Sequence, residues 1–121
     1  MKLGATIPFL RIFDEKLARD FYFSFLGFSL DFEHRFEETF PVFMQISKDD
    51  CIIQLSEHHE GCSPGAAINI AVLGLDQFCA DLNLKQYKYS RPEIHKTAWG
   101  TRDMTITDPF ANKLNFTEKC K

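Results

Sequence analysis

An apolar run near the start of the chain, followed by a periodic pattern of apolar and charged positions, predicts a strand and then a helix. Residues 5–13 are strand-like, and Pro8 favours an edge or terminal strand because proline cannot donate to a central ladder. Asp14 is a predicted N-cap. From 17 to 25 large apolar side chains recur every four residues opposite a charged face, which predicts an amphipathic helix that ends at Gly27.

Three short β-prone runs follow this helix and complete a βαβββ order. They cover residues 28–36, 42–47 and 51–57, and the segments between them are turn-like. Residues 58–66 then carry the Gly, Ser and Pro of a linker, and they lie near the middle of the chain.

The second half repeats the same plan without repeating the residues. The pattern predicts a strand at about 68–73, a helix over about 75–82, a weak strand at about 87–90, and strands at 102–107 and 113–117. The sequence Asp108-Pro109-Phe110-Ala111-Asn112 predicts a tight turn between the last two strands, with Asn112 able to take positive φ.

These elements predict an α+β fold made of two tandem βαβββ modules with cupped mixed sheets. We expect one domain over residues 1–121, with module 1 at about 1–60, a linker at about 58–66 and module 2 at about 67–121. Neither module buries a curved sheet alone, so pairing in a homodimer is expected.

Composition narrows the class of partner. The 14 Lys and Arg against 17 Asp and Glu give no basic excess, so nucleic acid is not expected. The four cysteines have no metal-binding or disulfide spacing, and Arg11 and Asp14 interrupt the apolar N-terminal run before it resembles a signal peptide. No stretch has membrane-spanning length, and we expect a cytoplasmic protein without membrane contact.

Motifs at both ends of the chain resemble one family. Asp14, Phe21-Tyr22 and Leu26-Gly27-Phe28 are similar to the opening signature of glyoxalase/bleomycin-resistance/dioxygenase modules, the vicinal oxygen chelate superfamily. Trp99-Gly100-Thr101-Arg102 and Asp108-Pro109-Phe110-Ala111-Asn112 are similar to the ending of the same modules. The resemblance spans nearly the whole chain, and it is nearest the bleomycin-resistance subgroup.

The resemblance also implies where a metal would be held. Metal-using members place four His or Glu ligands on the first and last strands of the two modules, and alignment puts these positions at Ile7, Gln54, Asn69 (or Ile70 after a one-residue slip) and Asn115. Ile7 has no lone pair, and neutral amides hold a divalent transition metal poorly without imidazole or carboxylate. We therefore expect no metal cofactor.

Several residues are candidates for ligand contact, and each also has an interpretation as a purely structural residue. Gln54 and Ser56 share a strand face, where Gln54 is a pocket amide or a satisfied core amide. Trp99 either stacks on a planar group of the ligand or lies in the core. Arg102 either binds an anionic group or forms a surface salt bridge, and the salt bridge is favoured. The full predicted ligand-binding set is His34, Phe36, Gln54, Ser56, His58, Trp99, Arg102 and Asn115.

Other candidates concern the histidine run and the phenylalanines. Glu57-His58-His59-Glu60 suggests a metal site, although adjacent side chains of a strand point to opposite faces, and a ligand-contacting rim or solvated edge is favoured. Most of the phenylalanines in or between the first strands are expected in the core, and one or two along a groove. These are Phe32, Phe36, Phe40 and Phe43.

Three functions remain open at this point. The resemblance implies a metal-free dimer that sequesters a small molecule, with a bleomycin-type antibiotic as the named ligand. The first alternative is a metal-dependent glyoxalase, dioxygenase or thiol transferase of the same fold that uses His34, Glu57 or His58. The second is a structural module with a closed, Phe-filled cavity and no ligand.

Overall fold

The structure is a computed structural model of the 121-residue chain, and it describes residues 1–35, 37, 41–58 and 62–120. The strands and helices follow in the order β1 (Phe9–Arg11), α1 (Glu15–Arg19), η1 (Asp20–Phe25), β2 (Ser29–His34), β3 (Phe43–Lys48), β4 (Cys51–Ser56), β5 (Ala67–Ala71), α2 (Leu75–Leu84), β6 (His95–Lys96), β7 (Thr101–Thr107) and β8 (Lys113–Lys119). Among these residues no helix is long and apolar enough to cross a membrane.

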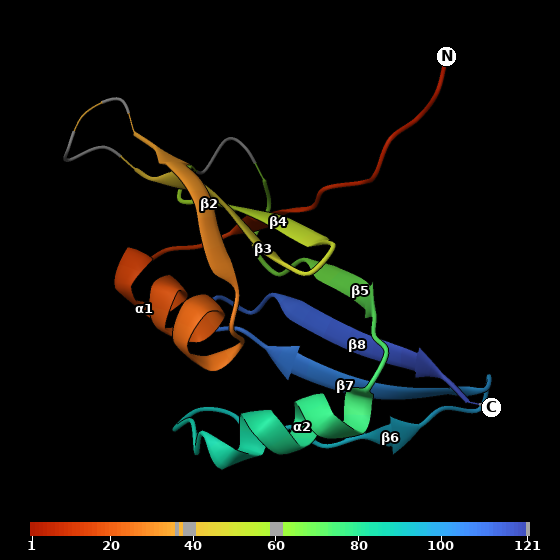
Figure 1. Cartoon of the computed structure of the whole chain (residues 1–121). Coiled ribbons are helices and arrows are strands. Elements are labelled where there is room, and N and C mark those ends of the chain that lie inside the picture. Colours follow the sequence, from red (N-terminus) through yellow and green to blue (C-terminus); the bar gives the residue numbers. More distant parts are fainter. Residues whose placement is uncertain (36, 38–40, 59–61, 121) are drawn as a thin grey trace.

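The strands form two four-stranded sheets with the same topology. The first has the order β1-β4-β3-β2 and the second the order β5-β8-β7-β6. In each sheet the first strand of the module runs parallel to the last, and the remaining neighbours are antiparallel. The helices lie along one side of the sheets (Figure 1). The predicted α+β fold of two βαβββ modules is confirmed.

The helix of the first module starts and stops where the sequence predicts, but it changes type inside. The Asp14 carboxylate accepts the backbone N–H of Leu17 at 3.0 Å, so the predicted N-cap is confirmed. The α-helix α1 then continues as the π-helix η1. Gly27, with φ of 85°, ends the helix in the left-handed conformation that favours glycine.

Three local predictions are wrong. The first strand covers only Phe9–Arg11 and not 5–13, because Pro8 cannot donate to the ladder on one side and β4, its parallel neighbour, ends at Ser56, the partner of Arg11, on the other. No strand forms at 87–90, where β6 was expected; the short β6 lies later in the chain at His95–Lys96. In the tight turn Ala111, not Asn112, takes the positive φ, at 70°.

The core lies between the helices and one face of each sheet. In the described part of the chain the buried apolar residues are Leu10, Ile12, Ala18, Phe21, Tyr22, Phe25, Leu26, Phe28, Val42, Met44, Ile46, Ile53, Leu55, Leu75, Leu82, Met104, Ile106, Phe110, Leu114 and Phe116. Along the central strands these residues alternate with more exposed ones, as expected for a sheet with one packed face. We call the other side of each sheet its open face.

A buried polar cluster joins the two modules at the tight turn between β7 and β8. The Tyr22 hydroxyl, from η1, donates to the Asp108 carboxylate at 2.6 Å. The side chain of Asn112 donates to that carboxylate and to the backbone oxygen of Arg11, both at 2.8 Å, and accepts the backbone N–H of Ala66 at 3.1 Å. The turn thus satisfies polar groups of β1, η1 and the segment before β5.

Candidate functional site

The open face of the first sheet carries a chain of hydrogen-bonded polar side chains. Gln54 on β4 donates to Gln45 on β3 at 2.8 Å, and Gln45 donates to Asp31 on β2 at 3.1 Å. Ser47 donates to the second oxygen of Asp31 at 2.7 Å. A β-bulge between Leu30 and Phe32 shifts the register and lets Asp31 reach this face. The amide of Gln54 is therefore held in one orientation.

Aromatic rings lie next to this polar chain. Phe43 on β3 lies between two others, with ring centroids 5.6 Å from Phe9 and 6.2 Å from Phe32. Phe9 is 45% exposed and Phe32 is 47% exposed, although each ring could contribute a large buried area. Of the four phenylalanines expected mostly in the core, Phe32 and Phe43 are described, and neither is a core residue. The face thus presents flat apolar surface beside fixed hydrogen-bonding groups.

The open face of the second sheet has a similar polar arrangement without the aromatic rings. Asn69 on β5 and Asn115 on β8 are register partners, and the Asn115 amide donates to the Asn69 oxygen at 3.0 Å and to Asp103 at 2.9 Å. Thr105 donates to the Asn115 oxygen at 2.8 Å. Asn115 occupies the position that corresponds to Gln54, since each lies on the last strand opposite a residue of the first.

Asp103 organises this second cluster. Its carboxylate accepts hydrogen bonds from Thr117 at 2.6 Å, from Thr101 at 2.8 Å and from Asn115. The bond from Thr117, followed by that from Asn115, holds the pKa of Asp103 below its ordinary value. The group is therefore a carboxylate at neutral pH, and its oxygens are engaged by hydroxyl and amide donors.

The expected metal positions do not fit a transition metal. Ile7 is aliphatic, and Gln54, Asn69 and Asn115 are amides that bond to each other or to nearby side chains. Within the described residues no group of three His, Cys, Asp or Glu could hold a metal ion. In the alternative set of His34, Glu57 and His58, the Glu57 carboxylate accepts the backbone N–H of Val42 at 3.0 Å. This donor set gives no basis for metal chemistry at either place.

The other residues predicted on the first module lie at one end of its sheet. Ser56 is buried at the end of β4, and its hydroxyl accepts the backbone N–H of His58 at 3.1 Å. His34 is the register partner of Phe43, so it shares the open face with the aromatic rings. Four residues singled out in the sequence lie outside the described residues. They are Phe36, Phe40, His59 and Glu60.

Two predicted contact residues lie away from these clusters. Arg102 is on the helix side of β7, where its guanidinium donates to both oxygens of Asp76 at 2.6 and 2.9 Å. This is the salt-bridged alternative that the sequence favoured. Trp99 is 76% exposed in the turn before β7, so it is not a core residue. The structure brings Gln54, Ser56 and His34 onto one sheet and leaves Asn115 on the other.

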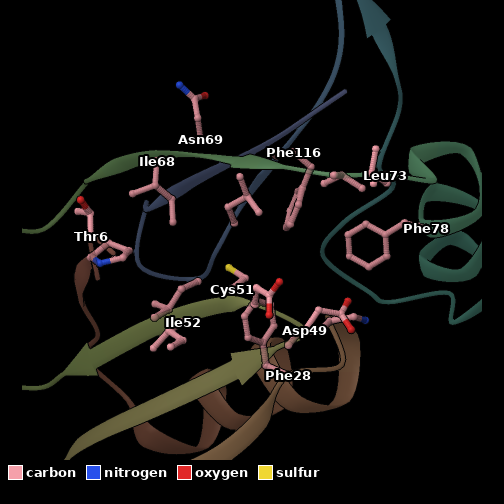
Figure 2. A pocket seen from close by; sticks show the side chains of 17 residues that line it. Thr6, Phe28, Asp49, Cys51, Ile52, Ile68, Asn69, Leu73, Phe78 and Phe116 are labelled. Carbon is pink, nitrogen blue, oxygen red and sulfur yellow. The ribbon is translucent and has the colours of Figure 1, made fainter. Parts of the chain in front are cut away.

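Sequence reasoning missed a cavity of about 610 Å³ between the modules. Figure 2 shows it between β5 with α2 on one side and the β3–β4 turn on the other, with Ile68 and Phe116 facing Cys51 and Ile52. Asn69 points to the opposite side of β5, toward the open face. No sequence signal identified this space, because its walls come from segments far apart in the chain.

Comparison with known proteins places this fold in a family. The family model described as "Glyoxalase superfamily protein" matches residues 1–121. The chain belongs to the glyoxalase superfamily. Among curated proteins, no sequence gives a significant match.

Solved structures share this fold at low sequence identity. One is the bleomycin-binding protein of the bleomycin producer Streptomyces verticillus, in complex with copper(II)-bleomycin, with a TM-score of 0.72, 21% identity and 98% of each chain covered. An antibiotic-binding protein from Streptomyces sp. CB03234 has a TM-score of 0.72 and 19% identity, again over 98% of each chain. A glyoxalase-related enzyme from Clostridium phytofermentans has a TM-score of 0.75 and 18% identity, over 98% of this chain and 97% of that one.

Proposed function

We propose that this member of the glyoxalase superfamily binds a small molecule without metal chemistry and sequesters an antibiotic of the bleomycin type in a groove of a homodimer. The proposal rests on the residues that occupy the expected metal positions. Gln54 and Asn115 are amides fixed by hydrogen bonds, and exposed phenylalanine rings lie beside Gln54. Such a surface supports capture through apolar contact and a few placed hydrogen bonds.

The two kinds of side chain on the first open face have complementary effects on binding. Phe9 and Phe32 offer ring area to an aromatic or heteroaromatic part of a ligand, and stacking of this kind is worth about 0.5–1.5 kcal/mol beyond burial. The network of Gln54, Gln45 and Asp31 holds its amides in place before the ligand arrives. A preorganised site loses less entropy on binding, which favours affinity for the ligand.

The homodimer part of the proposal rests on phenylalanine rings that are exposed in the single chain. Phe9, Phe13 and Phe32 are between 45% and 55% exposed in the single chain. Exposed aromatic surface of this kind commonly marks a binding site or an interface between chains. A second copy that covers part of each open face would bury these rings and form the walls of a groove. The two bleomycin-binding and antibiotic-binding neighbours support a ligand of this class.

The proposal is tested by titrating the purified protein with metal-free bleomycin in a calorimeter, in the presence of a chelator. We expect saturable binding with no change in the drug on mass analysis. Phe32→Ala should weaken binding by roughly tenfold, which corresponds to ~1.4 kcal/mol. The matched control is Tyr89→Ala, which removes another exposed ring, 68% exposed, from the loop after α2. Absence of binding, or an equal effect of both variants, would refute the bleomycin assignment.

A further inference from the structure

The cavity between the modules is a second concave space, separate from the open faces. Its second-module wall is aliphatic and aromatic, with Ile68, Ile70 and Phe116 from the helix side of the sheet. Phe78 of α2 closes one end, and its ring centroid lies 5.2 Å from that of Phe116. The volume of about 610 Å³ is in the range of sites that hold small organic ligands.

The mouth of the cavity carries charge from the turn between β3 and β4. Lys48, Asp49 and Asp50 all line the space. The Lys48 ammonium donates to the backbone oxygen of Leu26 at 3.0 Å and lies 4.9 Å from the ring centroid of Phe78. The ammonium therefore lies beside Phe78 in the wall of the cavity, held by a carbonyl oxygen and a ring.

The two aspartates behave differently from this lysine. Asp49 and Asp50 are exposed, and within the described part of the chain neither carboxylate has a hydrogen-bond or ion-pair partner. With the Lys48 ammonium, the mouth consequently carries a net negative charge beside an apolar interior. These carboxylates would repel an anionic headgroup and attract a cationic one.

We propose that the cavity is a binding site for a cationic amphiphile, a molecule with an aliphatic body and a protonated amine. The body would lie against Ile68, Ile70 and Phe116, and the ammonium would lie at the mouth near Asp49 and Asp50. The apolar wall of this site is the side of β5 opposite to the polar cluster of the second open face, and Asn69 of that cluster also lines the space. Each buried methylene of the body contributes to affinity through removal of apolar surface from water.

The probes that test this proposal are n-octylamine, n-octanoate and n-octanol, which share one aliphatic body and differ in headgroup charge. Each is titrated into the protein at pH 7, and binding is followed by nuclear magnetic resonance shifts of the cavity residues. We expect n-octylamine to bind with a dissociation constant on the order of 1 mM. Its affinity should exceed that of n-octanoate by about tenfold and that of n-octanol by about threefold.

Two variants separate the role of charge from that of the cavity. Asp49→Asn should lower the affinity for n-octylamine about threefold and leave n-octanol unchanged. Asn tolerates the left-handed φ of 53° at this position, so the turn is retained. The matched control is Asp81→Asn on the exposed side of α2, with no expected effect.

The second variant fills the space. Ile70→Trp should abolish binding of all three probes, and Leu84→Trp, at a position 79% exposed at the end of α2, should not. Equal affinity for n-octylamine and n-octanoate would overturn the proposal, as would binding that survives Ile70→Trp. Affinity that falls as the protein concentration rises would show that a second copy covers the cavity, and would overturn it too.

Discussion

The buried contact between Tyr22 and Asp108 allows a direct test of how the modules are held together. Tyr22 is fully buried and Asp108 is 4% exposed, and the hydroxyl donates to the carboxylate at 2.6 Å. Tyr22→Phe removes this donor and leaves the ring, so packing against Phe21 and Phe28 is kept. The Asp108 carboxylate retains its bonds from Asn112 and from the backbone N–H of Phe110.

The expected loss follows from the charge on the acceptor. A hydrogen bond to an ionised group contributes about 1.5–3 kcal/mol, compared with about 1 kcal/mol for a neutral pair. Because three other donors still satisfy Asp108, we expect Tyr22→Phe to lower the free energy of unfolding by about 2 kcal/mol. In a domain of this size that corresponds to a fall in Tm of about 6–12 °C.

The measurement is urea denaturation followed by circular dichroism, with thermal melts in parallel. Tyr89→Phe is the control, because the Tyr89 side chain is 68% exposed and should lose less than about 0.5 kcal/mol. A double-mutant cycle with Asp108→Asn should give a coupling energy above about 1 kcal/mol. If Tyr22→Phe costs no more than the control, the contact does not stabilise the junction and the reasoning fails.

Three further predictions use the same assays. Burial, and then the charge of Asp108, raise the pKa of Tyr22 well above its ordinary value of 10. The stability that the neutral phenol contributes is therefore present below about pH 10 and is lost as the pH rises further. The free energy of unfolding should fall less steeply with pH in Tyr22→Phe. Asp14→Ala should cost about 1 kcal/mol through loss of the N-cap bond, and Asp14→Asn much less. Gly74→Ala, at φ of 89°, and Gly27→Ala, at φ of 85°, should each cost about 1 kcal/mol, because the lysine ammonium 2.8 Å from a Cβ at Gly27 is the end of a flexible side chain and can move.

The sequence predicts well those features that depend on local periodicity. The cap at Asp14 and the stop at Gly27 are set by the chemistry of single residues, and both occur as predicted. The alternation in β4 and β8 also places Gln54 and Asn115 opposite the buried side chains of their strands, because a regular strand has a period of two.

The features that the sequence does not reveal depend on packing between distant segments. The cavity forms where the turn at Asp49 approaches Ile70 on β5, and neither segment carries a pattern that specifies the distance between them. The residues at 87–90 have strand-like composition, but Tyr87 instead stacks on Phe25, with ring centroids 4.4 Å apart. Tertiary contact thus overrides local β-propensity there.

The bulge in β2 has a consequence for any change in the length of this strand. It places Asp31 and Phe32 in succession on the open face, and it leaves Glu33 on the helix side, where its carboxylate accepts Arg19 at 2.7 Å. Deletion of Asp31 at the bulge would restore simple alternation, because Leu30 and Phe32 already pair with the consecutive residues Ile46 and Gln45, and the other side chains would keep their faces. Glu33 would keep its partner on α1, and Gln45 and Ser47 would lose their shared acceptor. Deletion of a residue elsewhere in the strand would instead exchange faces, so strand length, and not only residue identity, determines which side chains reach a ligand.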